Sequence, residues 1–69
     1  MKTFGNNLKE LRKALGISQF QLAKIIGTTP QRVSEWECNK VEPGLSSILK
    51  IIKALDTTFD ELTDGINKK

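Results

Sequence analysis

Residues 19–38, QFQLAKIIGTTPQRVSEWEC, contain two short helical patterns separated by Gly27. The first follows Ser18, whose hydroxyl can accept a hydrogen bond from a free helix amide while Gln21 reaches back in a capping box. The second follows Thr29 as N-cap and has Pro30 in its first turn, where the missing backbone N–H costs nothing. Two short helices bury little surface by themselves, so the rest of the chain is expected to pack against them.

The second of these helices, expected to run to about residue 38, has one apolar and one polar face. With Val33 pointing to the core, a helical wheel places three residues within roughly 60° of it: Pro30, Trp36 and Glu37. The polar face, centred roughly 160° away, carries Gln31 and Glu35, with Arg32 and Ser34 on its flanks. Glutamine, arginine and glutamate recognise adenine, guanine and cytosine edges in the major groove. The polar face is therefore either a base-reading surface or an ordinary solvated helix face.

Apolar residues elsewhere predict three further helices, which gives five short helices around one core. An N-terminal helix that ends at Gly16 has one apolar face, formed by Phe4, Leu8, Leu11 and Leu15. The helix after Ser18 is expected to bury Leu22, Ile25 and Ile26. A helix over about residues 45–55 is expected to bury Leu45, Ile48, Leu49, Ile52 and Leu55. A second capping box, TFDE at residues 58–61, opens a short helix through Leu62.

The composition predicts a single small domain over residues 1–69. The chain is 38% hydrophobic and 28% charged, and it shows no strand pattern, repeat or linker. The loop NKVEPG begins with Asn39, which adopts the left-handed backbone conformation nearly as readily as glycine. The last residues, about 64–69, are expected to be frayed.

Several classes of protein are excluded by what the sequence lacks. It has no histidine and one cysteine, so a histidine-assisted nucleophile, a histidine-ligated metal and a thiolate zinc site are ruled out. We therefore expect no enzyme activity, no catalytic residue, no metal and no cofactor. No apolar run approaches the roughly 18 residues of a membrane span, and MKTFGNN lacks the apolar middle of a signal peptide. A cytoplasmic protein without a membrane partner is the expectation.

The charge is unevenly distributed along the chain. Residues 1–40 contain seven Lys or Arg against three Glu, whereas residues 41–69 contain four against five Asp or Glu. A basic half of this kind suits a protein that binds nucleic acid, although a net charge of +3 is by itself weak evidence.

These motifs together resemble the helix-turn-helix of the phage repressor and Cro family, the Xre-type regulators. The matching residues are Gln19, Leu22, Ala23, Gly27, Val33 and Trp36. The segments EWECNKVEP and ILKIIKALDTTFDEL also resemble the family, so the similarity covers about residues 4–66. It implies an all-α, compact five-helix lambda-repressor-like domain with the helix-turn-helix at about residues 18–38. The chain departs from the family at Asn39, where glycine is usual, and at Phe20, where a small or charged residue is usual.

The resemblance and the helical wheel imply the same DNA-binding site. The expected base-reading residues are Gln31, Glu35, Arg32, Ser34 and Pro30. The expected phosphate-binding residues are Gln19, Thr28, Thr29, Asn39 and Lys40. The function expected is that of a sequence-specific transcriptional regulator, with a repressor favoured, whose partner is double-stranded DNA. Three alternatives stay open: a DNA-binding antitoxin or restriction-system controller, a fragment of a longer regulator, and an Xre-like domain that docks a protein partner.

Two further predictions concern stability and assembly. Glu37 lies on the core side of its helix and needs a partner, and Arg12 is the best candidate because the neighbouring helix carries it next to Leu11; the resemblance implies the same pair. A weak homodimer on an inverted-repeat operator is expected, because one small domain contacts few base pairs. The candidate interface residues are Ile66, Phe59 and Leu62.

Overall fold

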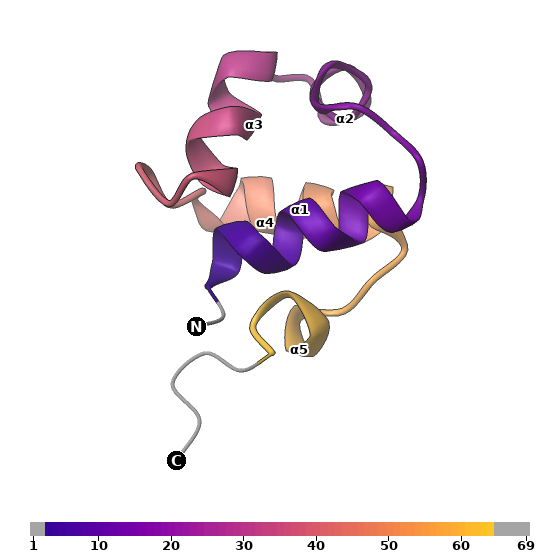
Figure 1. Cartoon of the computed structure of the whole chain (residues 1–69), viewed down its shortest axis with the longest axis vertical. Helices are drawn as coiled ribbons and strands as arrows, with labels where there is room; N and C mark the ends of the chain where they lie inside the picture. Colours follow the sequence, from indigo (N-terminus) through magenta and orange to yellow (C-terminus); the bar gives the residue numbers. More distant parts are fainter. Residues whose placement is uncertain (1–2, 65–69) are drawn as a thin grey trace.

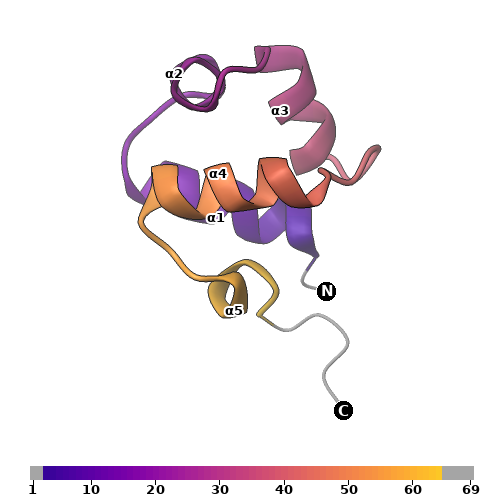
Figure 2. The same cartoon turned by 180° about the vertical axis from the view of Figure 1, so that it is seen from behind.

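The computed structural model describes residues 3–64, which form five α-helices and no strand. In chain order these are α1 (Phe4–Ala14), α2 (Gln19–Ile26), α3 (Pro30–Glu37), α4 (Leu45–Leu55) and α5 (Phe59–Leu62). In Figures 1 and 2, α1 and α4 cross the centre, α2 and α3 lie at one end, and α5 lies at the other. The predicted all-α architecture and the order of its helices are confirmed. The expected frayed tail falls almost entirely outside the described residues.

The predicted helix starts are formed by the expected side chains. At α2, Ser18 Oγ accepts from the Gln21 backbone N–H at 3.0 Å, and the Ser18 N–H donates to Gln21 Oε1 at 2.8 Å. At α3, Thr29 Oγ1 accepts from the Arg32 N–H at 3.2 Å. The second capping box is only half formed, because the Glu61 carboxylate accepts from the Thr57 hydroxyl.

One buried cluster holds all five helices together. Trp36 is its largest member, and the other fully buried large side chains are Leu8, Leu22, Ile51, Leu62 and Val33. Burying a side chain of this kind contributes about 1.5–3 kcal/mol, so the cluster supplies most of the favourable free energy of folding. Gly27 has a φ of 78° and Asn39 a φ of 61°, which are the left-handed conformations that the tight connections on either side of α3 require.

The apolar face of α4 was predicted correctly for Ile48, Ile52 and Leu55 but wrongly for Leu45 and Leu49. Leu45 is 70% exposed and Leu49 is 57% exposed, whereas Ile51 is completely buried. Helix α4 is apolar on two overlapping stripes, and the one formed by residues 48, 51, 52 and 55 meets the core. The same kind of error applies to Ile25, which is 60% exposed, and to Leu15, which is 52% exposed. Periodicity identified these helices correctly but did not determine which of two apolar stripes is covered.

Asn7 is a buried polar residue that sequence analysis missed. Its side-chain N–H groups donate to the carbonyl oxygens of Leu62 at 2.8 Å and Asp64 at 2.9 Å, which joins α1 to the end of α5. Asn7 lies three residues after Phe4 and four before Leu11, within the apolar stripe of α1. A polar residue in an apolar stripe was the signal that could have identified it.

The α1 helix approaches the end of α3 so closely that only glycine fits at position 5. A Cβ atom on Gly5 would lie 2.5 Å from the carbonyl oxygens of both Trp36 and Glu37. The Gly5 N–H donates to Asn39 Oδ1 at 3.0 Å, and Asn39 Nδ2 donates to Thr3 Oγ1 at 2.9 Å. The side chain of Asn39 therefore fixes the chain after α3 to the start of α1.

Arg12 and Glu37 form the ion pair expected from the sequence. Arg12 Nε donates to Glu37 Oε2 at 2.7 Å and Nη2 donates to Oε1 at 3.1 Å, a two-pronged contact between buried side chains. Arg12 Nη1 also donates to the Ile17 carbonyl at 2.7 Å, and Gln19 Nε2 donates to Glu37 Oε1 at 3.0 Å. The pair therefore connects α1, α2 and α3.

We predict that Arg12→Ala lowers the free energy of unfolding by about 3–5 kcal/mol, because it leaves the Glu37 carboxylate buried without its charged partner. Urea denaturation followed by circular dichroism measures this loss. Lys13→Ala is the matched control, since Lys13 is exposed on the same helix and its loss should change stability by less than about 0.5 kcal/mol. Equal denaturation midpoints for the two variants would contradict the prediction.

We also predict that Gly5→Ala destabilises the protein by about 1–3 kcal/mol, because the new methyl group must push α1 away from backbone atoms of α3. This loss should outweigh the roughly 1 kcal/mol by which alanine favours a helix over glycine. Thermal unfolding measures the difference. Gly44→Ala serves as the control, because nothing lies within 4 Å of a Cβ at that position, and a stabilised Gly5→Ala variant would show that α1 and α3 are not held in close contact.

Candidate nucleic-acid interface

The predicted base-reading residues lie together on the outer side of α3. Gln31 and Arg32 are exposed and Ser34 and Glu35 are half-buried, whereas the opposite side of the helix is buried through Val33, Trp36 and Glu37. Pro30 is exposed at the start of the helix, so its predicted place on the core side is wrong, although it does lie beside the polar face. Figure 1 shows this end of α3 next to α2, at the end of the molecule opposite α5.

The predicted phosphate-binding residues lie at the two ends of α3 and at the start of α2. Thr28 and Thr29 form the connection before α3, Lys40 follows it and is exposed, and Gln19 is the first residue of α2. The first backbone N–H groups of a helix point out of its N-terminus and carry a partial positive charge, which favours phosphate. The starts of α2 and α3 therefore add backbone donors to the exposed cations Arg32 and Lys40.

Three of these side chains have partners within the protein. The Thr29 cap was predicted from the sequence, whereas the partners of Gln19 and Asn39 were not. The Gln19 amide donates to Glu37, the Thr29 hydroxyl caps α3, and both polar atoms of the Asn39 side chain bind α1 or the residue before it. Asn39 is therefore held as a structural connector. Gln19 is oriented by the Arg12–Glu37 pair and keeps one amide hydrogen that this contact does not use.

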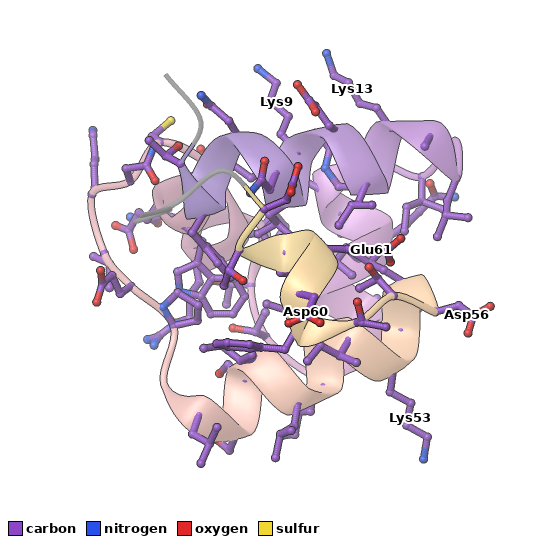
Figure 3. All side chains as sticks on the ribbon, turned by 90° about the horizontal axis from the view of Figure 1, so that it is seen from below. Lys9, Lys13, Lys53, Asp56, Asp60 and Glu61 are labelled. Carbon is purple, nitrogen blue, oxygen red and sulfur yellow. The ribbon has the colours of Figure 1, made fainter. Side chains whose placement is uncertain are left out.

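The opposite end of the molecule is acidic. A surface groove between α1 and α5 is lined by four carboxylates, from Glu10, Asp60, Glu61 and Asp64. In Figure 3, which looks onto the α5 end, the labelled side chains of Asp60 and Glu61 belong to α5. A polyanion approaching the molecule is repelled from this end, which leaves the end formed by α2 and α3 as the favoured one.

The described residues offer no basis for metal chemistry or for a membrane-spanning helix. Within residues 3–64, no three His, Cys, Asp or Glu side chains are grouped so that they could hold a metal ion. In the same range no helix is long and apolar enough to cross a membrane.

The structure supports only part of the predicted dimer interface. Leu62 is completely buried in the monomer, so its assignment to a dimer interface is wrong. Phe59 is 54% exposed and stays a candidate, and Ile66 lies outside the described residues. Sequence analysis missed the exposed pair Leu45 and Leu49, which lie one turn apart on α4. Phe20, one of the two departures from the family pattern, is exposed on α2.

Two solved structures are similar to this chain over most of its length. The P22 c2 repressor in complex with a synthetic operator superimposes with a TM-score of 0.87 at 32% identity, covering 94% of this chain and 98% of that one. The restriction-modification controller protein C.AhdI from Aeromonas hydrophila has a TM-score of 0.81 at 41% identity, covering 86% of this chain and 89% of that one.

Curated relatives are similar in sequence but mostly longer. An uncharacterised HTH-type transcriptional regulator, YonR, of a Bacillus subtilis prophage is 36% identical over 62 residues, which is 90% of this chain and 57% of the relative. Repressor protein C2 of Salmonella phage P22 is 34% identical over 88% of this chain, which spans only 28% of that repressor. The helix-turn-helix family model matches residues 8–62, most of the chain, and includes every residue of α2 and α3. The chain therefore belongs to the Cro/C1-type helix-turn-helix family, which is a family of DNA-binding regulators and not of enzymes.

Proposed function

We propose that this chain is a sequence-specific DNA-binding transcriptional regulator, acting as a repressor, that inserts α3 into the major groove. The observation that carries the proposal is the outer face of α3, where Gln31, Arg32 and Glu35 project from a helix whose other side is fixed by the core. The similarity to a repressor solved on its operator supports the same assignment. The proposed location is the cytoplasm, which is consistent with a DNA-binding regulator.

Each residue of this face has a distinct role in base recognition. Gln31 can make two hydrogen bonds to adenine, and Arg32 can do the same with guanine. Glu35 accepts from the cytosine amino group and repels the neighbouring phosphates, so it favours binding only where a cytosine is opposite. Pro30 and Ser34 lie beside these residues and complete the contact, Pro30 against a thymine methyl group. Lys40, Thr28 and the N-terminus of α2 hold the phosphates that fix the position of α3.

The regulator is proposed to bind as a weak homodimer on an inverted-repeat operator. A single module of this size buries roughly 600–1,000 Å² on DNA, and two-fold pairing doubles the contact. Phe59 on α5 and the exposed pair Leu45 and Leu49 on α4 provide apolar surface for this pairing. Two copies related by a two-fold axis present their recognition helices about 34 Å apart on one side of the DNA.

A restriction-system controller is the second candidate function. Its support is the similarity to C.AhdI, which extends over 89% of that controller. Both functions require the same DNA-binding surface, so they differ in the genes beside the operator and not in the chemistry of the site. No contact within residues 3–64 favours the antitoxin alternative.

We predict that binding to DNA weakens steeply with salt. Each phosphate neutralised adds about −0.9 to the slope of log K against log salt, so a dimer making ~6–10 phosphate contacts loses about 10³-fold or more in affinity between about 50 and 200 mM salt. Sequences selected from a random duplex pool supply the probe for fluorescence anisotropy at several salt concentrations. A slope near zero would mean that phosphate contacts do not drive binding.

Variants should separate phosphate contacts from base contacts. Lys40→Ala should weaken binding to all sequences similarly and reduce the salt slope by about 1. Gln31→Ala and Glu35→Ala should instead relax preference at one base pair each, by about 1–3 kcal/mol, and leave the slope nearly unchanged. The same selection and anisotropy measurements apply. If the Lys40 and Gln31 variants behave alike, the proposed division of roles is wrong.

We predict mostly monomer in dilute solution and two chains per duplex on an inverted repeat with half-site centres about 10–11 base pairs apart. Sedimentation velocity with and without DNA measures both states. Leu49→Gln should lower affinity for the full site and leave binding to a half-site unchanged. Leu15→Gln should affect neither, because Leu15 is exposed just after the end of α1. One chain per duplex at saturation, or equal affinity for half-site and full site, would rule out the dimer.

A further inference from the structure

An apolar groove lies between α2 and α4, separate from the outer face of α3. It is lined by Ile25, Ile26, Lys50, Lys53 and Ala54. Ile26 is buried, whereas the neighbouring Ile25 is 60% exposed and forms the edge of the groove. Single exposed apolar residues are common on protein surfaces, but here the exposed isoleucine continues into a hollow whose other apolar lining residues are Ile26 and Ala54. The groove therefore presents apolar surface that the protein itself leaves uncovered.

The charge of this groove is entirely positive. Neither α2 nor α4 contains Asp or Glu, and both lysines of the groove are exposed. Within residues 3–64, the side chains of Lys50 and Lys53 have no hydrogen-bond or ion-pair partner. The carboxylate that follows in the chain, Asp56, belongs to the turn after α4 and does not line the groove. An occupant that brings both apolar side chains and negative charge would complement this surface.

We propose that the groove docks a short acidic amphipathic segment of a partner protein. Its apolar side chains contact Ile25, Ile26 and Ala54, and its carboxylates approach Lys50 and Lys53. The two lysines and Ala54 span five residues of α4, about 6 Å along the helix, which provides space for one or two apolar side chains. A short motif is therefore sufficient, and binding in the micromolar range is expected.

Other occupants fit this surface less well. The phosphates of DNA would bind the two lysines, but DNA offers no aliphatic side chain to cover the two isoleucines. A second copy of this chain carries acidic residues around Phe59 on α5, but that residue belongs to the surface proposed for two-fold pairing. Because the groove uses none of the outer residues of α3, a copy bound to its operator can hold the partner segment at the same time.

The test uses three synthetic helical peptides and the whole chain labelled with ¹⁵N and ¹³C. The first peptide has two leucines one turn apart among glutamates, the second has lysines in place of the glutamates, and the third has serines in place of the leucines. Methyl and amide spectra are recorded during titration. The first peptide should shift the signals of Ile25, Ile26 and Ala54 saturably, and the other two should bind at least about tenfold more weakly.

Charge-reversal variants locate the contact. Lys50→Glu and Lys53→Glu should each weaken the first peptide by about tenfold or more, because they replace attraction with repulsion. Lys13→Glu is the matched control and should leave peptide binding unchanged, since Figure 3 shows Lys13 on α1 and Lys53 on α4 pointing to opposite sides of the molecule. Ile25→Ser tests the apolar part, with Leu15→Ser as its control. The spectrum of each variant without peptide reports whether it is folded.

Several outcomes would overturn the proposal. Equal binding of the glutamate and lysine peptides, shifts confined to α3 or α5, or no shifts at millimolar peptide would each exclude an acidic partner at this groove. Shifts of the Ile25 and Ala54 signals on dilution of the protein alone would identify a second copy as the occupant. The same shifts on addition of operator duplex would identify DNA. Peptide binding is measured without DNA, so failure of the proposed operator binding would be seen separately.

Discussion

The contact between the Arg12 guanidinium and the Glu37 carboxylate determines how the first three helices are arranged. All three nitrogens of the Arg12 guanidinium donate hydrogen bonds: Nε and Nη2 to the Glu37 carboxylate on α3, and Nη1 to the Ile17 carbonyl before α2. The Gln19 amide adds a link from α2 to the same carboxylate. A hydrophobic contact would tolerate sliding between helices, whereas this two-pronged contact specifies the orientation of α3 relative to α1.

A fixed orientation matters because α3 has only eight residues. Isolated helices of that length are not stable in water, so α3 depends on tertiary contacts along its inner side. Val33 and Trp36 supply burial, Glu37 supplies the ion pair, and Gly5 allows α1 to approach the last turn. Since the inner side and the Thr29 cap stabilise the helix, the outer side is free to carry Gln31 and Glu35, which contribute little to folding.

Local chemistry made most of the fold predictable from the sequence. Capping residues, the glycine turns and the Arg12–Glu37 pair depend on short-range rules or on one strong electrostatic requirement, and they were found where expected. The polar face of α3 was predicted for the same reason. The partners of Asn39 and Asn7 were not predictable in this way, because each joins residues more than thirty positions apart and depends on how whole helices pack.

The remaining errors have a shared physical origin. Helical periodicity shows that a face is apolar, but it does not show whether the surface covering that face belongs to the same chain. Ile25, Leu45 and Leu49 were all expected in the core and are all more than half exposed. A small domain has too few helices to cover every apolar stripe it carries, and exposed stripes are retained at a cost in solubility. These exposed residues are the ones that both proposals use: Leu45 and Leu49 at the proposed two-fold contact, and Ile25 at the edge of the apolar groove between α2 and α4.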